Sequence, residues 1–352
     1  MSLPILPSRP RHQGRILAEA ARRAIPLDVS IELTHHCNFR CQHCYIPDFQ
    51  APDRMSTRRV LRLLEELAEM GTLYLTLTGG ELFLRRDWLE IAVRARELGF
   101  VLRLFSNGSL IDGDVADAIA PLNATVEISL YAMDEEVFDE ITQRPGSFAR
   151  TIRGIELLRQ RSIPVLIKVP MMVLNQDQLA AVAAYAAAVG AECQASPTIM
   201  AKKDGDTSTL GLRIPQQRLA DFFGGPHSGC HVLEEQADDP RIDGPQCAAA
   251  SRYCNITSAG EVMACNILPG SGGSLLERSF REIWEGSPWL QKIRSIRRRD
   301  LHTCKSCSKI SYCGRCHAQA LVEDGDLYGP SSFAQQRAAL MEEGAESHEP
   351  IP

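Results

Sequence analysis

The residues with the clearest capacity for chemistry are cysteines, of which the 352-residue chain has twelve. Ten of them are clustered: Cys37, Cys41, Cys44, Cys247, Cys254, Cys265, Cys304, Cys307, Cys313 and Cys316. Within the clusters the gaps are short, as in Cys-Asn-Phe-Arg-Cys-Gln-His-Cys over residues 37–44. Short loops let successive thiolates converge on one metal centre, so we predict that the clustered cysteines bind metal.

The rest of the composition excludes several other classes of protein. In a cytosolic chain of this size, clustered cysteines more often bind metal than form disulfides. The formal net charge of -6 disfavours duplex nucleic acid as the main partner. Apolar runs such as residues 179–191 are shorter than the ~18 residues of a membrane span, and residues 1–15 lack the apolar core of a signal peptide. We therefore expect a soluble, cytoplasmic protein that binds neither nucleic acid nor membrane.

Alternating β-rich and helical segments must position the first cysteines. We expect strands at Val29–Thr34, Leu73–Thr78, Phe100–Phe105, Thr125–Tyr131, Ile163–Met171 and Glu192–Thr198. Asp87 and Gly99 delimit one intervening helix, and Asn175 and Gly190 delimit another. Six such units predict an α/β fold, a partial (β/α)6 TIM-like barrel whose functional loops follow the carboxyl ends of the strands.

The pattern changes after Gly205, where Gly- and Pro-marked loops begin. We expect an N-terminal extension (1–26), the barrel (27–225), a small cysteine-rich domain (226–336) and a flexible tail (337–352). The cysteine-rich domain should contain short helices and a β-hairpin that turns at Ala259-Gly260. The tail is rich in glutamate and poor in apolar residues.

Three cysteines in one loop suggest a particular kind of cluster. A four-iron cluster requires four ligands, so Cys37, Cys41 and Cys44 would leave one iron open to an external ligand. The CxxxCxxC motif resembles that of the radical S-adenosylmethionine (SAM) superfamily, and it follows the first strand as it does there. The resemblance implies that the open iron of a 4Fe-4S cluster binds SAM. One electron then cleaves SAM to methionine and a 5′-deoxyadenosyl radical, which removes a hydrogen atom from a substrate.

Further positions are similar to the SAM-binding residues of that family. They are His43, Gly79, Gly80, Glu81, Ser106, Asn107, Ser129 and Lys168. The resemblance places Glu81 at the SAM ammonium, His43 near the adenine and Lys168 near the SAM carboxylate. The polar residues at strand ends could instead cap helices, and Lys168 could instead face solvent.

The remaining clustered cysteines resemble the SPASM extension of peptide- and protein-maturing radical SAM enzymes. By this resemblance, one auxiliary cluster is held by Cys247, Cys254, Cys265 and Cys316. A second auxiliary cluster is held by Cys304, Cys307 and Cys313. No cysteine follows Cys316, so the second cluster is open, oxygen-ligated from residues 325–332, completed by a distant residue such as Cys230, or absent. A zinc ribbon is the alternative for the last four cysteines. Cys193 and Cys230 are otherwise expected to be small buried apolar residues.

The leading hypothesis is a radical SAM/SPASM oxidoreductase that modifies a ribosomally synthesised precursor peptide, similar to the pyrroloquinoline quinone and mycofactocin peptide maturases. Cross-linking, oxidation, decarboxylation and epimerisation all remain open, and no general base is assigned. Only 36 residues precede Cys37, so we expect leader recognition by a separate protein or by the barrel surface. A flavodoxin- or ferredoxin-like protein would donate electrons. The alternatives are a sulfatase-type protein maturase, an enzyme acting on a tetrapyrrole, or a non-catalytic zinc-binding module.

Overall fold

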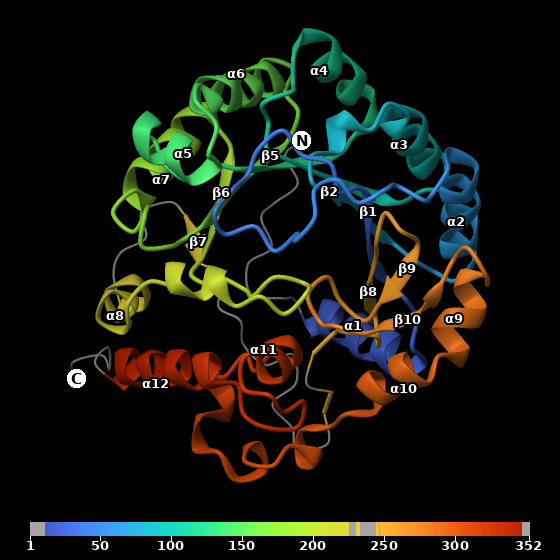
Figure 1. Cartoon of the computed structure of the whole chain (residues 1–352), viewed down its shortest axis with the longest axis vertical. Coiled ribbons are helices and arrows are strands. Elements are labelled where there is room, and N and C mark those ends of the chain that lie inside the picture. The colour runs from blue at the N-terminus through green and yellow to red at the C-terminus, as the bar shows by residue number, and fades with distance from the viewer. Residues whose placement is uncertain (1–10, 225–229, 233–243, 246, 347–352) are drawn as a thin grey trace.

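Six parallel strands form the centre of the molecule, as predicted. The computed structural model describes residues 11–224, 230–232, 244–245 and 247–346 (Figure 1). The strands are β1 (Asp28–Thr34), β2 (Tyr74–Gly79), β3 (Val101–Ser106), β4 (Thr125–Ser129), β5 (Val165–Pro170) and β6 (Glu192–Ser196). They are hydrogen-bonded in chain order, and each pair is parallel. The predicted partial barrel is therefore confirmed.

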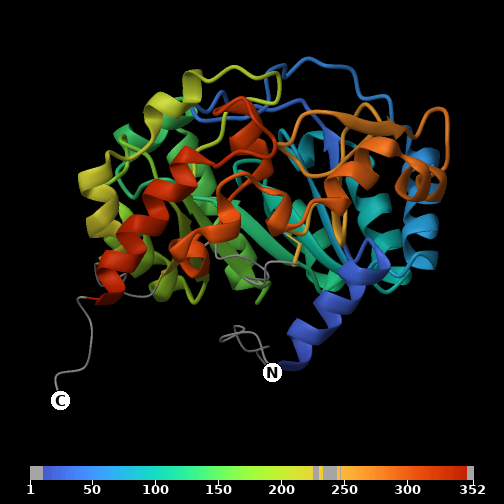
Figure 2. The ribbon, with the colours of Figure 1, turned by 90° about the horizontal axis from the view of Figure 1, so that it is seen from below.

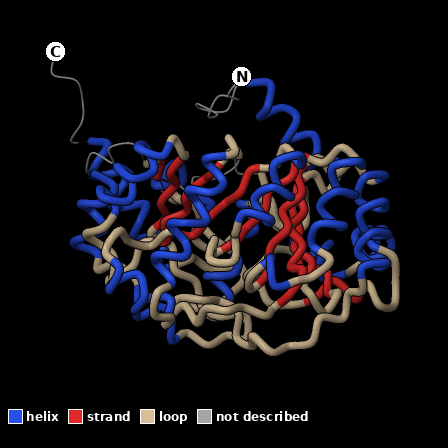
Figure 3. The backbone as a smooth tube through the Cα atoms, turned by 90° about the horizontal axis from the view of Figure 1, so that it is seen from above, coloured by secondary structure: helices blue, strands red, loops and turns tan. Residues whose placement is uncertain are grey.

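Helices cover the outer face of these strands (Figures 1 and 3). They are α2 (Thr57–Glu69), α3 (Trp88–Glu97), α4 (Gly113–Ile119), α5 (Glu135–Thr142), α6 (Ser147–Gln160) and α7 (Leu179–Val189). Alternate residues of β1, such as Ile31 and Leu33, are fully buried, as are Leu64 and Leu67 of α2. The intervening strand residues are often polar, as at Glu32. Side chains alternate between the two faces of a strand, so the polar set faces the interior of the barrel.

At the predicted starts of two helices, the polar side chain does not cap the helix. Asp87 precedes α3, but its carboxylate binds Arg85 and Thr57 and makes no cap hydrogen bond. The Asn175 side chain accepts from the amide of Met172 at 2.7 Å, and Gln178 precedes α7. The side chains of Asp87 and Asn175 thus bind nearby groups instead of capping a helix. These partners cannot be predicted from the sequence, because they depend on the geometry of the turn.

The cysteine-rich part of the chain extends the barrel sheet rather than standing apart from it. The predicted hairpin is present as β8 (Tyr253–Ile256) and β9 (Glu261–Met263), with Gly260 in the left-handed region at φ 87°. β8 pairs in parallel with β1, and β10 (Ser271–Ser274) pairs with β9. At the opposite edge, β7 (His231–Val232) pairs with β6. The ten strands form one continuous sheet.

Among the described residues, three short helices lie in the cysteine-rich part, α9 (Phe280–Gly286), α10 (Pro288–Ser295) and α11 (His317–Val322). Helix α8 (Gln216–Gly224) precedes this part, and the 15-residue α12 (Ser332–Glu346) follows α11. The prediction of a flexible tail from residue 337 is wrong as far as Glu346, because α12 packs against α8 and buries Ala338 beside Cys313 (Figure 2). Residues 347–352 lie outside the described residues.

The N-terminal helix α1 (Arg11–Arg23) projects from the end of the barrel where the strands begin. The long loops gather at the other end, beyond the carboxyl ends of the strands (Figure 3). Within the described ranges, no helix has the length and apolar character needed to cross a bilayer.

Candidate functional site

A cavity of about 390 Å³ lies at the carboxyl ends of the strands. It is lined by Cys37, Cys41 and Cys44 together with seven of the eight residues expected to bind SAM, which are His43, Gly79, Gly80, Ser106, Asn107, Ser129 and Lys168. These residues come from different strand ends, which parallel pairing brings to one edge of the sheet. The structure thus collects the predicted residues in one place, and their individual contacts with SAM stay predictions.

The glycines of the Gly79-Gly80-Glu81 segment let the cysteine loop pack against the end of β2. A Cβ atom at Gly79, whose φ is 149°, would lie 2.2 Å from the Thr34 carbonyl oxygen. A Cβ atom at Gly80 would lie 2.4 Å from the carbonyl oxygen of His36. Any side chain at either position would therefore displace the backbone that leads into Cys37.

Glu81 lies behind the cavity wall. Its carboxylate is fully buried and accepts hydrogen bonds from the Ser106 hydroxyl and the Asn107 amide, both at 2.8 Å. The Asn107 side chain in turn donates to Asn38 of the cysteine loop at 2.8 Å. Burial raises the pKa of Glu81 above its ordinary value, although these hydrogen bonds oppose the shift. In this arrangement Glu81 fixes the loop after β3, and its contact with the SAM ammonium stays a prediction.

The cysteine loop is also anchored to α5. The amides of Arg40 and Gln42 donate to the carbonyls of Thr142 and Ile141, at 3.0 and 2.9 Å. The last carbonyls of a helix lack partners within the helix, so this contact satisfies both segments. Sequence inspection missed this role of α5, because the hydrogen bonds involve only backbone atoms.

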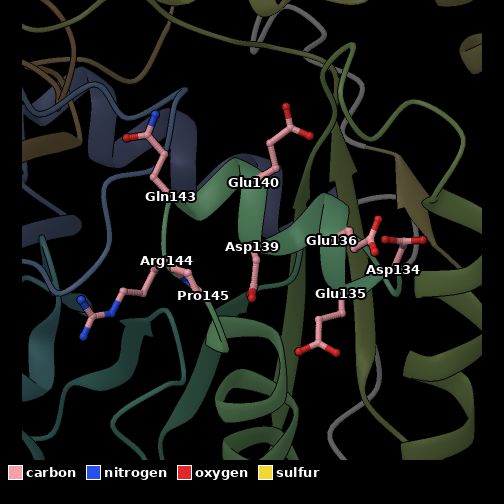
Figure 4. Close-up of a pocket in the computed structure, with 8 residues that line it drawn as sticks. All are labelled: Asp134, Glu135, Glu136, Asp139, Glu140, Gln143, Arg144 and Pro145. Atoms are coloured by element: carbon pink, nitrogen blue, oxygen red, sulfur yellow. The ribbon is translucent and has the colours of Figure 1, made fainter.

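The outer face of α5 is acidic and is hollowed beside the helix (Figure 4). Asp139 accepts from the amide of Phe148 at 3.0 Å, so it is committed to joining α5 and α6. The remaining carboxylates, Asp134, Glu135, Glu136 and Glu140, are spread along the helix (Figure 4). We assign this surface no ligand.

The three thiols of the cysteine loop require a positively charged partner to ionise. Burial raises the pKa of Cys37 to about 11 and that of Cys41 to about 12, and the charge of the Cys44 thiol acts in the same direction on both. Metal ligation deprotonates thiols and compensates buried thiolates. This donor set, three soft ligands close together at the edge of a cavity, fits an iron-sulfur cluster with one open iron.

His43 and Tyr131 form part of the cavity wall beside the thiols. Their rings pack edge to face with centroids 5.0 Å apart, and the Tyr131 hydroxyl lies 3.6 Å from the Cys41 sulfur. Burial lowers the pKa of His43 to about 4, so its imidazole is neutral. Its Nδ1 atom is buried and has no hydrogen-bond partner among the described residues. An unpaired ring nitrogen in the wall fits a ligand with hydrogen-bonding edges, such as an adenine.

The inner end of the cavity contains an ion pair that sequence inspection did not identify. Lys168 lines the cavity, and its ammonium lies 3.2 Å from a carboxylate oxygen of Glu127. The same ammonium donates to the side-chain carbonyl of Gln194. Register places Ser129, Lys168 and Gln194 side by side on β4, β5 and β6. Lys168 thus faces the cavity with its side chain 28% exposed, and its contact with the SAM carboxylate stays a prediction.

The later cysteines gather around a buried arginine. Arg315 is 3% exposed and donates to the carbonyls of Gly329 and Leu327 at 2.7 and 2.5 Å. Burial lowers its pKa, whereas the thiols of Cys304, Cys316, Cys247 and Cys313 raise it. A buried guanidinium surrounded by thiols fits thiolate-bound clusters, whose net charge is negative.

Cys254 lies on the outer face of β8, opposite to Asn255. It pairs with Val29 on β8, and the following residue, Asn255, donates to Glu32 on the interior face. Alternation directs Cys254 to the opposite face. The charged groups acting on its thiol are Asp28 and Arg294, and no other cysteine in the described residues is among them. This geometry favours a buried packing role for Cys254, and its assignment as a ligand stays a prediction.

Cys193 and Cys230 form a disulfide that links β6 to the segment before β7. This pairing overturns the expectation that both are isolated apolar residues, and it excludes Cys230 as the missing ligand of the second auxiliary cluster. The oxygen alternatives within residues 325–332 have other partners: Asp326 accepts from the Tyr328 amide and pairs with His302, and the Ser331 and Ser332 hydroxyls donate to Gln319 and Asp324.

Cys304 and Cys307 act on the thiol of Cys313, so these three cysteines lie near one another. In the described part of the chain, no three His, Cys, Asp or Glu side chains are close enough to hold a single metal ion. A four-iron cluster is larger than one ion, so its ligands stand further apart.

Comparison with known families agrees with this site. Residues 31–186 match the radical SAM superfamily, and residues 247–317 match SPASM, an iron-sulfur cluster-binding domain. The chain therefore contains a radical SAM domain followed by a SPASM domain. It is an oxidoreductase-type enzyme whose two domains imply a SAM-binding 4Fe-4S cluster, SAM, and one or two auxiliary iron-sulfur clusters.

Curated relatives resemble the chain over most of its length. It is 25% identical to the AdoMet-dependent heme synthase of Methanosarcina barkeri, covering 86% of this chain and 94% of that protein. It is 24% identical to the PqqA peptide cyclase of Granulibacter bethesdensis, covering 90% of each. It is 26% identical to the mycofactocin maturase MftC of Mycobacterium ulcerans, covering 93% of this chain and 92% of that one.

A solved structure has the same fold. Streptococcus suis SuiB bound to S-adenosylmethionine superposes with a TM-score of 0.71 at 16% identity, covering 95% of this chain and 84% of SuiB. SuiB bound to its precursor peptide SuiA superposes with a TM-score of 0.70 at 15% identity over the same shares.

Proposed function

We propose that this radical SAM enzyme modifies a ribosomally synthesised precursor peptide. The observation that carries the proposal is the character of the cavity. Its volume of about 390 Å³ is near the lower end of the ~300–1,000 Å³ typical of ligand sites. SAM itself is a ligand of that size class, so SAM would fill most of this space and leave no room for a second large ring.

The charges in the cavity support the same conclusion. Among the described residues that line it, Lys168 is the one lysine or arginine, and Glu127 pairs with it. A tetrapyrrole carries several carboxylates, each of which would need a cationic partner when buried. By contrast, Phe49, Ile199, Met200 and Ile267 make much of the remaining wall apolar. An apolar or aromatic side chain of a peptide matches these surroundings.

The chain's own residues prepare the site in distinct ways. Cys37, Cys41 and Cys44 would hold the cluster, and Lys168 would orient the SAM carboxylate. When bound, the cluster and SAM supply reductive cleavage of the sulfonium bond and a radical that removes hydrogen from the substrate. Neutral His43 would contact the adenine, and the aromatic wall keeps water from the reacting end.

The auxiliary part supports a peptide reaction in a further way. Oxidative modification requires removal of electrons from the substrate, and thiolate-bound clusters around Arg315 would accept them. A flavodoxin- or ferredoxin-like electron donor and a separate peptide-recognition protein belong to the same proposal. Ten of the twelve cysteines are free, and the other two form the Cys193–Cys230 disulfide. Because free thiols predominate, as is usual in a reducing compartment, we infer a cytoplasmic enzyme.

The deciding experiment is incubation of the anaerobically reconstituted, reduced protein with SAM and a peptide encoded by a neighbouring short reading frame. Mass spectrometry should detect a modified peptide that is absent when Cys41→Ala replaces the wild type. Parallel incubation with a carboxylated tetrapyrrole tests the alternative that the heme synthase relative raises, and we expect no conversion. Conversion of the tetrapyrrole but not of the peptide would refute the proposal.

A further inference from the structure

The helices α2 and α3 form a groove on the outside of the barrel. The α2–α3 groove has a volume of about 430 Å³ and is lined by residues of both helices, which are Thr57, Arg58, Leu61, Arg62, Glu65 and Glu90. Exposed apolar residues continue this surface along α3, where Leu89 is 36% exposed and Val93 is 40% exposed. Helical spacing places Val93 one turn from both Leu89 and Glu90. The surface thus offers a partner both a recess and apolar contact area.

Arginines surround the upper part of this groove, where the two helices begin. Five exposed arginines lie on α2, in the segment before it or in the turn before α3, and they are Arg54, Arg58, Arg59, Arg62 and Arg86. Within the described ranges, none of the five forms an ion pair with a carboxylate. Of the two carboxylates that line the groove, Glu65 is already paired with Arg94 at 2.9 Å. This face is therefore locally positive, although the whole chain has a formal net charge of -6.

The stability of α2 does not account for these arginines. The amino-terminal end of a helix carries a partial positive charge, so cations there are unfavourable and carboxylates are preferred. Helix α2 nevertheless begins with Thr-Arg-Arg and has no acidic residue in its first turn. The positive charge consequently lacks compensation within the helix, and an acidic partner would supply it.

The groove is also tied to the backbone that leads into the cysteine loop, whose cluster is called the SAM cluster below. The Thr57 hydroxyl, at the start of α2, donates to Asp87 at 2.6 Å, and Asp87 precedes α3. The Asp87 carboxylate pairs with Arg85 at 2.5 Å. Arg85 in turn donates to the Leu33 carbonyl at 2.7 Å, four residues before Cys37. Both helices begin at the end of the barrel where the strands end, so a protein bound here lies beside the cysteine loop.

We propose that the α2–α3 groove and its arginines are the docking surface for the small acidic protein that donates electrons to the SAM cluster. The inference rests on the flavodoxin- or ferredoxin-like donor of the proposed function and names the place where that donor binds. One electron leaves the reduced donor and enters the oxidised cluster, and no atom or proton is transferred. An electron donor needs only to approach the cluster, whereas a substrate must enter the cavity, so a surface on the outer wall suits the donor. The local positive charge attracts an acidic carrier that the net charge of the chain would repel.

The test measures release of 5′-deoxyadenosine from SAM by the reconstituted protein, with reduced flavodoxin as the limiting electron donor. No peptide is added, so the result does not depend on the substrate. The double variant Arg58→Glu, Arg62→Glu should lower the second-order rate constant for flavodoxin about ten- to one-hundred-fold at low salt. The wild-type rate should fall as salt is added, whereas the rate of the variant should change little. Val93→Ser should raise the flavodoxin concentration that gives half-maximal rate about three- to ten-fold.

Photoreduced deazariboflavin, a small uncharged reductant, separates docking from damage to the site. It should drive SAM cleavage equally in the wild type and in the double variant, and an equal loss with both reductants would overturn the proposal. Deazariboflavin that drives the wild type where flavodoxin does not would refute the donor itself, and the docking surface with it.

The matched control is Arg150→Glu, Arg153→Glu. These two exposed arginines lie on α6, on another side of the barrel (Figure 1), and their replacement changes the net charge by the same amount. The control should keep the wild-type rate with flavodoxin, and a comparable loss would show that only net charge matters. An unchanged flavodoxin rate in the Arg58→Glu, Arg62→Glu variant would also overturn the proposal. So would a loss confined to modification of the precursor peptide, because the groove would then serve the peptide.

Discussion

Substitution of Gly80 by alanine tests whether the end of β2 sets the position of the SAM cluster loop. The new Cβ atom would lie 2.4 Å from the His36 carbonyl oxygen and 2.5 Å from that of His35. Contacts of this length are not tolerated, so the backbone leading into Cys37 must move by roughly half an ångström or more. Such overpacking costs about 1–3 kcal/mol of folding free energy. A displacement of about 1 Å near a reacting centre can lower activity ~100-fold.

We therefore expect Gly80→Ala to lose about ten- to one-hundred-fold in the rate of SAM cleavage and about 1–3 kcal/mol in stability. The assays are release of 5′-deoxyadenosine under reducing, anaerobic conditions and denaturant unfolding of the same preparation. Gly286→Ala is the matched control, because a Cβ atom there meets nothing within 4 Å and the substitution should leave both quantities unchanged. Wild-type cleavage and stability in Gly80→Ala would refute the argument that this glycine positions the loop.

Three further predictions concern the cysteines. Cys41→Ala should abolish SAM cleavage, whereas Cys316→Ala should spare it and stop substrate turnover; continued cleavage by Cys41→Ala would contradict the assignment of the first cluster. If Cys254 only packs, Cys254→Ala should retain the wild-type iron and sulfide content, measured by metal analysis, at a cost of about 1 kcal/mol; loss of about four irons would show that Cys254 is a cluster ligand. Cys230→Ser should keep its iron but lose up to about 4 kcal/mol in denaturant unfolding, because the disulfide closes a 37-residue separation; reduced iron content would instead make Cys230 a cluster ligand.

The polypeptide sequence was most informative where function depends on local spacing. The motif at residues 37–44 brings three thiols together through one short loop. Each expected strand could be predicted from its β-branched and apolar residues. Gly79 and Gly80 were identifiable because close backbone approach leaves little choice of residue. These features, including the partial barrel and the hairpin turn at Gly260, depend on neighbours within one segment or on adjacent βα units.

Tertiary structure decided the features that depend on partners distant in the chain. The parallel pairing of β8 with β1 places Cys254 on the face opposite to Asn255, and a shift of one residue in that register would turn its side chain to the interior. Cys193 meets Cys230, and Glu32 meets Lys203, only because the sheet edges and the loop after β6 are folded together. Sequence alone thus determined which chemistry the cysteine loop performs. The folded sheet determined which thiols and charged groups lie near the cysteine loop, because contacts between remote segments leave no pattern in the local sequence.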